Sequence, residues 1–368
     1  MNTSRILITG GAGFIGSNFV HYWCARHPGH RVVVLDALTY AGNPASLSGL
    51  DAFAGYRFVH GDIRDRALVT DLLEQERIDT VVHFAAESHV DRSIHGPDVF
   101  IDTNVLGTHT LLKAAHEVWS GAGPDPARYR FHHVSTDEVY GSLELEDAPF
   151  TEESPYNPSS PYAASKAASD HLVRAYHRTY GLPVTISNCS NNYGPRHFPE
   201  KLIPLMTVNA LQGKPLPIYG SGRNVRDWLH VEDHCRGIEA ILLHGANGRT
   251  YNIGGNCERT NSEIVETLCA ELDRRFASEA ALRERFPECP AASGESTQSL
   301  VRHVKDRPGH DLRYAINAER MRRELGFRPE HTLQTGLKQT VGWYLENEDW
   351  WHRVLDGSYA QWIEKQYG

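Results

Sequence analysis

Positive charge is scarce in this sequence of 368 residues: 37 lysines and arginines stand against 46 aspartates and glutamates, a formal net charge of −9. That balance argues against non-specific nucleic-acid binding, which needs a basic surface. No apolar run approaches the roughly 20 residues that cross a bilayer. No signal peptide precedes the first strand-like run, Arg5–Ile8. We therefore expect no nucleic-acid partner and no membrane partner.

Cysteine is also sparse, and the six that occur form no Cys-x-x-Cys pair. Without an export signal, we expect reduced thiols in a cytoplasmic protein rather than a disulfide framework. The sequence contains no HExxH or other cluster of metal ligands. We therefore expect no metal site, and we expect His132 and His133 to pack inside a sheet.

The first half of the chain alternates short β-branched runs with longer helical patterns. This order predicts an α/β fold with a doubly wound, parallel Rossmann sheet. The predicted strands are Arg5–Thr9, Val32–Asp36, Arg57–His60, Thr80–Phe84, Arg130–Ser135 and Val184–Asn188. The predicted helices between them are Phe14–Arg26, Arg66–Glu76, Val99–Trp119 and Pro161–Tyr180.

After about residue 190 the pattern changes, because proline and glycine interrupt the chain more often. Length favours about two domains. We place the first at 1–190 and a smaller, mixed α/β domain at 191–368, with some of its segments packing back on the first. Cys289–Gln298 is expected to be a flexible surface loop. Further predicted helices are Pro199–Gln212, Glu232–Leu243, Ser262–Phe276 and Ala318–Leu325.

A glycine-rich turn follows the first strand directly. Gly10, Gly13 and Gly16 have the spacing G-x-x-G-x-x-G and lead into a predicted helix. Missing side chains let the backbone approach a pyrophosphate, and the helix N-terminus favours that anion. Asp36 ends the second strand, where a carboxylate can hold the ribose hydroxyls of NAD and repel a 2′-phosphate. Asp62, after the third strand, fits either an adenine contact or a helix N-cap.

A second group of polar residues follows the strand Arg130–Ser135. Thr136, Asp137 and Glu138 come directly after it, and Tyr162 and Lys166 lie four residues apart on a predicted helix. A lysine cation near a phenol lowers the pKa of the phenol and favours a general base. An isolated pair with this spacing is more often a packed aromatic and a surface lysine. Together with the glycine turn and Thr136, it indicates a catalytic site.

At this point the chain resembles the extended short-chain dehydrogenase/reductase family, and within it the dTDP-glucose 4,6-dehydratases. The resemblance covers nearly the whole chain and includes the segments 85–93, 191–195, 226–234 and 306–311. The adjacent acids Asp137 and Glu138 are its most specific element. It implies a lyase that binds NAD in residues 1–190 and a nucleotide sugar, dTDP-glucose, in residues 191–368.

The resemblance also implies the chemistry. Tyr162 takes the proton of the sugar 4-hydroxyl while NAD oxidises C4; Lys166 holds the phenolate and Thr136 bonds the 4-oxygen. Glu138 then removes the C5 proton, and Asp137 protonates the departing 6-hydroxyl. NAD is regenerated when C6 is reduced, which leaves a 4-keto-6-deoxy sugar. Two adjacent enclosed carboxylates push their pKa values apart, so their roles are a coupled property.

Further site residues are carried over from the resemblance. Positive groups should face the diphosphate, and an aromatic residue should stack on the base. The implied cofactor contacts, besides the glycines, Asp36, Asp62, Tyr162 and Lys166, are Phe14, Ile15, Leu38, Thr39, Ile63, Ala85, Ala86, Ser88, Thr103 and Asn192. The implied substrate contacts are Ser88, Thr136, Asn191, Lys201, Leu202, Pro217, Ile218, Tyr219, Arg226, Asn261, Asp306, Arg307 and His310.

Two questions stay open at this stage. The helices Val99–Trp119 and Pro161–Tyr180 resemble helices that pair across a dimer in this family, so we expect a homodimer; simple packing on the sheet is the alternative. For the activity, the alternatives are a 4-epimerase, a decarboxylase, a GDP-mannose 4,6-dehydratase, or a non-catalytic NAD-binding regulator. The pair Asp137–Glu138 disfavours the first two, and Pro217–Tyr219 disfavours the third less firmly.

Overall fold

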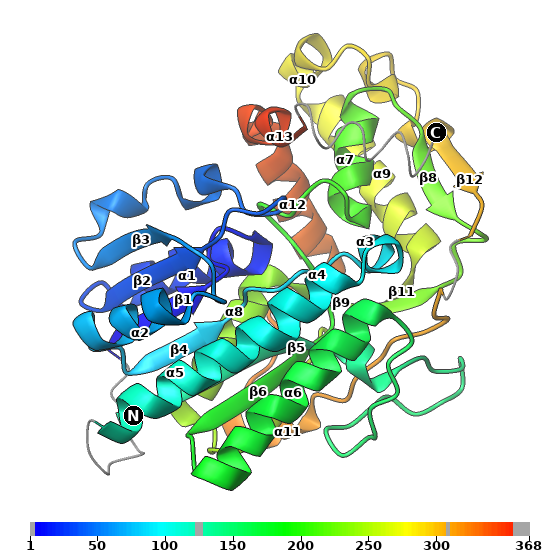
Figure 1. Ribbon diagram of the computed structural model, residues 1–368. Coiled ribbons are helices and arrows are strands. Elements are labelled where there is room, and N and C mark those ends of the chain that lie inside the picture. The colour runs from blue at the N-terminus through cyan, green and yellow to red at the C-terminus, as the bar shows by residue number, and fades with distance from the viewer. Residues whose placement is uncertain (1–3, 122–127, 307–309, 356–368) are drawn as a thin grey trace.

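A computed structural model describes residues 4–121, 128–306 and 310–355 and places seven parallel strands in one central sheet (Figure 1). The strand order is β10-β6-β5-β4-β1-β2-β3. The chain therefore builds the sheet from β1 outward through β2 and β3, and then returns to the other side of β1 and continues through β4, β5, β6 and β10. This confirms the predicted doubly wound parallel sheet. Its strands are β1 (Arg5–Thr9), β2 (Arg31–Asp36), β3 (Tyr56–His60), β4 (Thr80–His83), β5 (Arg130–Thr136), β6 (Val184–Cys189) and β10 (Thr250–Ile253).

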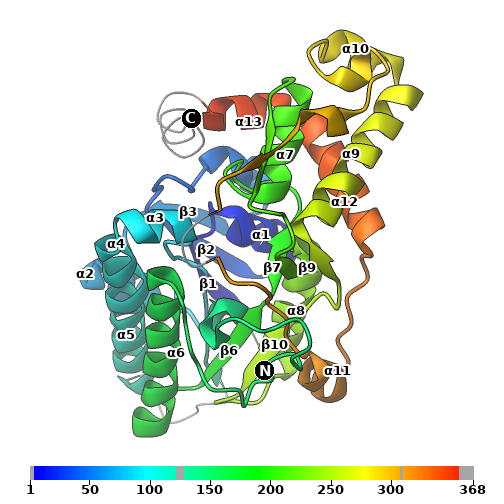
Figure 2. The same ribbon diagram turned by 90° about the vertical axis from the view of Figure 1, so that its right-hand side faces the viewer.

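Helices cover both faces of this sheet. On one face, α1 (Phe14–Arg26) and α8 (Val231–His244) share an apolar cluster that includes Phe19, Trp23 and Ile241. On the other face, α2 (Arg66–Gln75), α5 (Thr108–Gly121) and α6 (Pro161–Tyr180) lie side by side (Figures 1 and 2) and bury leucines and valines in a second cluster. The sheet is thus buried on both sides, as all-parallel sheets are.

The predicted helix Val99–Trp119 is helical but not uniform. It begins as α4 (Asp98–Phe100), continues as the π-helical turn η3 (Ile101–Gly107) and ends as α5. Within the π turn, Asn104 points inward: its side chain accepts from the Glu87 amide at 2.8 Å and donates to Ser165 Oγ at 2.8 Å. π-Helical turns are frequent at functional sites, and this one directs a polar side chain into the interior.

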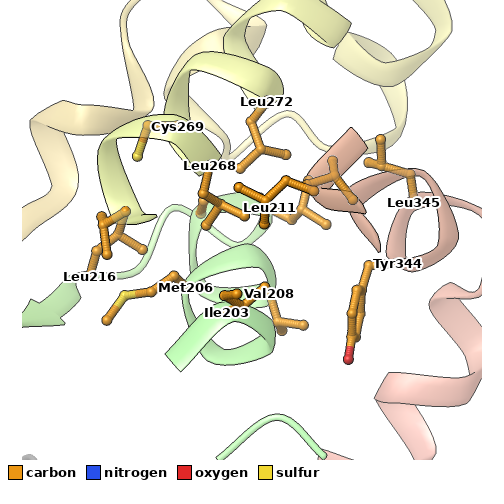
Figure 3. Packing of buried hydrophobic residues seen from close by; sticks show 14 of the residues in the cluster. Ile203, Met206, Val208, Leu211, Leu216, Leu268, Cys269, Leu272, Tyr344 and Leu345 are labelled. Carbon is orange, nitrogen blue, oxygen red and sulfur yellow. The ribbon is translucent and has the colours of Figure 1, made fainter. Parts of the chain in front are cut away.

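A second group of elements lies beside the sheet, next to the segment that follows β6 (Figure 2). Helices α7 (Leu202–Leu211), α9 (Asn261–Ser278) and α12 (Leu333–Glu346) pack through leucines, Met206 and Tyr344 (Figure 3). Other elements here are α3 (Val90–His95), β7 (Asn191–Tyr193), β8 (Leu216–Tyr219), β9 (Val225–His230), β11 (Glu258–Thr260), α10 (Ala280–Arg285), β12 (Val301–Val304) and α13 (Glu348–Leu355). Helix α11 (Glu319–Leu325) packs instead on β10 and α8, where Met321 joins the apolar cluster of the first face. Strands β11, β9 and β7 form one small sheet, and β12 and β8 form another.

The predicted flexible loop Cys289–Gln298 is wrong. The segment forms the short 3-10 helices η6 (Pro290–Ala292) and η7 (Thr297–Leu300). Cys289 is buried in the apolar cluster, and Thr297 donates to Asp273 from both its amide and its hydroxyl, at 3.0 and 2.9 Å. The polar composition of the segment does not reveal these contacts, because each contact depends on residues from another part of the chain. Across the three described ranges, every helix is too short or too polar to cross a membrane.

Candidate active site

The glycine turn between β1 and α1 needs residues without a side chain. Gly10 adopts a left-handed φ of +70°, and its amide donates to the Leu35 carbonyl at 2.9 Å. A Cβ there would lie 2.6 Å from the Ala85 backbone nitrogen, and a Cβ at Gly16 would collide with the Gly10 carbonyl oxygen. The turn therefore presents bare backbone at the start of α1, which is a cradle for an anionic group.

A cavity of about 340 Å³ opens above this turn, at the carboxyl ends of the central strands. This is where doubly wound sheets bind their ligands. Of the residues expected to contact the cofactor, those that line the cavity are Gly10, Gly13, Phe14, Ile15, Gly16, Asp36, Thr39, Asp62, Ile63, Ala85, Ala86, Ser88, Thr103, Tyr162, Lys166 and Asn192. Leu38 does not line it; its amide donates to Asp36 instead.

Asp36 is buried at the end of β2 and fixes two loops. Its Oδ2 accepts from the Ala12 amide in the glycine turn at 2.8 Å, and its Oδ1 accepts from the Leu38 amide at 2.8 Å. Burial raises the pKa of this carboxyl despite the two hydrogen bonds. Each carboxylate oxygen can accept more than one hydrogen bond, so acceptors remain for two ligand hydroxyls.

Asp62 is not the N-cap of α2, which was one of its two expected roles. That position belongs to Asp65, whose side chain accepts from the Leu68 amide at 3.1 Å. Asp62 lines the cavity and holds Arg64, accepting from its amide at 2.8 Å and from its guanidinium at 2.7 Å. The hydrogen bond from Arg64 holds the pKa of Asp62 below its usual value.

The acid pair begins at the carboxyl end of β5. Thr136 caps the 3-10 helix η5 (Asp137–Tyr140): its hydroxyl accepts from the Glu138 amide at 3.3 Å and donates to Asp137 Oδ1 at 3.3 Å. Only 2% of Asp137 is exposed. Burial, followed by the neighbouring charges of Glu138 and Asp227, raises the pKa of Asp137 well above its usual value. These effects favour the neutral acid, which is the form that can donate a proton.

Tyr162 and Lys166 lie in the first turns of α6, which begins where Ser160 accepts from the Ala163 amide and Pro161 fits the first helical position. Both line the cavity, and only 4% of Lys166 is exposed. Its ammonium donates to the Val134 carbonyl at 2.8 Å, and burial lowers its pKa to about 8. Both side chains therefore face the same cavity, as the four-residue spacing predicts.

The expected lowering of the Tyr162 pKa is wrong. Burial, followed by the charge of Glu138, raises the pKa of this phenol well above its usual value. Positive charge placed beside the phenol would act in the opposite direction and favour the phenolate.

The residues expected to bind substrate fall into two places. Ser88, Thr136, Asn191 and Lys201 line the cavity, where Lys201 Nζ donates to the Ser88 carbonyl at 3.3 Å. The others that the structure describes do not line it: Leu202, Pro217, Ile218, Tyr219, Arg226, Asn261, Asp306 and His310. Arg307 lies outside the described residues.

Most of this second group surrounds β8 and β12. Tyr219 donates to Asp91 Oδ2 at 3.5 Å, and its ring meets the ring of His310, which bonds Asp306 at 2.7 Å. Arg226 lies closer to the acids: its charge acts on Asp137, and its guanidinium covers the Tyr314 ring at 4.4 Å. Leu202 packs against the apolar cluster, and the Asn261 amide donates to Asn224.

Several cavity residues were not predicted. Glu200 is buried beside Arg92, whose Nε lies 3.4 Å from its carboxylate, and burial raises the pKa of Glu200 to about 7. The His197 ring stacks on Phe14 at 3.9 Å, which joins the segment after β7 to the start of α1. Both residues lie shortly before Lys201, which was predicted to contact the substrate. This proximity was the signal in the sequence that could have indicated them. Other unpredicted lining residues are Arg64, Glu87, Val99, Ser135, Cys189, Ser190 and Phe198.

One group of possible metal ligands occurs elsewhere in the described part of the chain: His230, Glu232 and His331. These residues do not line the cavity. The His331 nitrogens already contact Asp233 at 3.0 Å and Gln339 at 3.1 Å. His230 Nδ1 accepts from the Glu232 amide at 3.4 Å. The group is thus explained by capping and side-chain hydrogen bonds. His132 and His133 are both buried inside the sheet, as expected.

Comparison with known proteins gives consistent results. Residues 7–340 match the family model described as GDP-mannose 4,6 dehydratase. The chain is 56% identical over 355 residues to a dTDP-glucose 4,6-dehydratase of Xanthomonas campestris pv. campestris, covering 96% of each chain. It is 51% identical over 372 residues to the Salmonella typhimurium dTDP-glucose 4,6-dehydratase, covering 99% of each.

A solved structure is similar over the same length. The dTDP-glucose 4,6-dehydratase DesIV from Streptomyces venezuelae, crystallised with NAD and TYD bound, superposes with a TM-score of 0.83. The two chains are 50% identical, and the match covers 95% of this chain and 99% of the other. With this identity over nearly the full length, the chain belongs to the dTDP-glucose 4,6-dehydratase family of the extended short-chain dehydrogenase/reductases.

Proposed function

We propose that this protein removes water from dTDP-glucose to give dTDP-4-keto-6-deoxyglucose, with a bound NAD that each turnover regenerates. The observation that carries the proposal is the convergence of Asp137, Glu138, Tyr162 and Lys166 on one cavity above the glycine turn. Full-length relatives at 50–56% identity named for this activity support it.

The cavity fits a dinucleotide. The bare backbone at Gly10 and Gly16 leaves room for a pyrophosphate, and a Cβ at either position would fill the cradle. Asp36 would bind the adenosine ribose, and a carboxylate there disfavours a 2′-phosphate. Asp62 would face the adenine, and Lys166 would hold the nicotinamide ribose. When bound, NAD supplies the reversible two-electron oxidation that makes C4 a ketone and later reduces C6.

The first proton transfer belongs to Tyr162. Its phenolate oxygen takes the proton of the 4-hydroxyl while the Thr136 hydroxyl bonds the 4-oxygen. Burial raises the pKa of Tyr162, so positive charge beside the phenol favours formation of the base. Lys166 would supply part of that charge, and NAD, when bound, would supply the rest.

The elimination belongs to the acid pair. The C4 ketone acidifies the neighbouring C5–H, and the Glu138 carboxylate removes that proton. Burial and the charge of Glu138 favour the protonated form of Asp137, which would protonate the 6-hydroxyl as water leaves. Glu138 then returns a proton to C5. The two acids thus act as base and acid on adjacent carbons.

The remaining charged residues would bind the nucleotide. Lys201 and Arg226 would neutralise the diphosphate, with Asn191 and Asn261 as neutral donors and Tyr219 against the base. Residues 1–190 would hold the cofactor and 191–368 the sugar nucleotide. Helix α8 and strand β10 come from the second range but pack with the first sheet. The structure supports this division through the position of the segment 190–201, which lines the cavity from above the strand ends.

A homodimer is part of the proposal. Large apolar side chains are exposed on α3 and η3: Ile94, Ile101 and Leu106 are 42–52% exposed. The η3 turn runs directly into α5, which lies beside α6 (Figure 1). A second copy of the chain would cover these side chains. A monomeric mass by light scattering at micromolar concentration would contradict the dimer. We place the protein in the cytoplasm, which suits six cysteines that are all unpaired.

The decisive experiment is mass spectrometry of dTDP-glucose incubated with the purified protein in D2O, with no added cofactor. The expected product has lost one water and carries one solvent deuterium at C5. This result requires C5 proton removal and a cofactor retained through purification. No reaction after addition of NAD, and none with UDP- or GDP-sugars, would overturn the proposal.

A further inference from the structure

Next to Lys166 lies a row of buried polar side chains that the chemistry above does not use. His133 Nε2, on β5, lies 3.5 Å from Lys166 Nζ and 3.2 Å from Asp170 Oδ1. The side chains of His133 and Asp170 are completely buried, and neither lines the cavity. Asp170 follows Lys166 by four residues on α6, so both project from one face of the helix. The three groups form a row that runs from the cavity wall into the protein.

Asp170 is held as a carboxylate. Its Oδ2 accepts from Tyr156 OH at 2.7 Å, Ser135 Oγ at 3.0 Å and Asn188 Nδ2 at 3.4 Å. Burial alone would raise the pKa of Asp170, but the hydrogen bond from His133 and the nearby cations lower it. A carboxylate that accepts several hydrogen bonds keeps its charge in the interior.

The other titratable groups beside Lys166 within the sheet are shifted toward their neutral forms. Burial lowers the pKa of His83, from β4, far below its usual value and that of His133 to about 4. Burial also raises the pKa of Cys189, from β6, so this thiol stays protonated. Asp170 is the carboxylate whose charge opposes the effect of burial on Lys166.

The outer side of Asp170 faces a further cation. Arg174, one helical turn beyond it, donates to Tyr156 OH at 2.6 Å. The same guanidinium also lies over the Tyr156 ring, 4.7 Å from its centre. Tyr140, from η5, faces the same carboxylate, and burial raises its pKa beyond the physiological range. The carboxylate thus lies between the ammonium of Lys166 and the guanidinium of Arg174.

We propose that Asp170 is a positioning residue, whose buried carboxylate acts across His133 to hold Lys166 as an ammonium bound to the Val134 carbonyl, where it can serve Tyr162. The proposal rests on the proposed function for the task of Lys166. The placement of the charge rests on the geometry alone. An uncharged Lys166 would leave Tyr162 facing the negative charge of Glu138 without a cation to oppose it, which disfavours the phenolate.

The first test measures the charge of Lys166 directly, without substrate. The chain has only seven lysines, so a protein labelled with 13C in lysine gives few signals, and Lys166→Met identifies the one that matters. In Asp170→Asn, which keeps the shape of the side chain, the Lys166 signal should titrate about one pH unit lower than in the wild type, a tenfold change in proton affinity. An unchanged titration would overturn the proposal.

The second test is the pH profile of the reaction. With a Lys166 pKa of about 8 in the wild type and about 7 in Asp170→Asn, the charged fraction at pH 8 falls from about one half to about one tenth. The turnover number should therefore fall about fivefold at pH 8 and converge with the wild type at pH 6, with KM unchanged. A uniform loss at all pH values would indicate a merely structural role and would refute the proposal.

Two further variants keep the test decisive. Asp79→Asn makes the same change in a buried carboxyl at the opposite end of the sheet, where Asp79 accepts from the Ser4 and Arg5 amides. It should leave the Lys166 titration unchanged. If Asp170→Asn does not fold, Asp170→Glu retains the charge and should keep the wild-type titration; a lower one would contradict the proposal. Absence of dehydration by the wild type would refute the proposed function, whereas the titration tests the positioning alone.

Discussion

Replacing Asp36 by alanine should destabilise this protein even when no cofactor is present. The carboxylate does more than face a ligand, because it accepts one backbone amide from the glycine turn and one from the loop after β2, each at 2.8 Å. Hydrogen bonds to a charged group contribute about 1.5–3 kcal/mol each, so the two together contribute about 3–6 kcal/mol. Removing the cost of burying the carboxylate offsets part of this, and we expect a net loss of about 2–4 kcal/mol.

The assay is urea denaturation of the cofactor-free protein, followed by tryptophan fluorescence. Asp36→Asn keeps one acceptor oxygen and should fall between the wild type and Asp36→Ala. Asp62→Ala is the matched control, since Asp62 follows the neighbouring strand and lines the same cavity but accepts from the half-exposed Arg64, through its guanidinium and its amide. Loss of these exposed contacts should cost about 1 kcal/mol. Equal losses for Asp36→Ala and Asp62→Ala would refute the reasoning, because they would show that the two backbone hydrogen bonds of a buried carboxylate contribute no more than exposed contacts within one turn.

Three more substitutions give distinct outcomes. Tyr162→Phe should prevent any reduction of bound NAD by dTDP-glucose, as followed by near-ultraviolet absorbance; a wild-type rate would exclude Tyr162 as the base. Asp137→Asn should still reduce the cofactor but should slow water loss by about 10²–10⁴-fold, the usual contribution of a general acid, and full activity would refute this assignment. Asp233 and His331 should make stability pH-dependent, since the pKa of Asp233 is lowered and that of His331 is raised. The Asp233 contribution is present above pH 3.8 and is lost as the pH falls; the His331 contribution is present below pH 6.5 and is lost as the pH rises through its raised pKa. Asp233→Asn should abolish both steps in a urea-denaturation series.

The sequence alone predicted those parts of the site that are formed by a single strand end or a single helix. The glycine turn, the acids after β5 and the spacing of Tyr162 and Lys166 each depend on a few neighbouring residues, so the pattern alone places them. The same is true of α1, whose predicted bounds match the structure. Strand ends in a parallel sheet meet at one edge, which brings these groups together without further information.

Contacts between distant segments could not be predicted in this way. Strand β10 has only four residues and no repeating pattern, yet it pairs with β6. The direction of the Tyr162 pKa shift depends on burial and on the charge of Glu138, and no spacing rule reports either. Asp170 looked like an ordinary polar residue of a helix. Its place beside His133 became visible only when β5 and α6 were packed together.

The stacked contact between Phe14 and His197 has a kinetic consequence. The cofactor cavity is bordered below by the start of α1 and above by the segment that also carries Glu200 and Lys201. We expect a dinucleotide seated beneath these rings to leave more slowly while the contact holds. Measuring the residence time of the cofactor in the wild type and in a variant without the stacked ring would test this. For a catalyst that restores its oxidant in every cycle, such retention removes any dependence on the free cofactor pool.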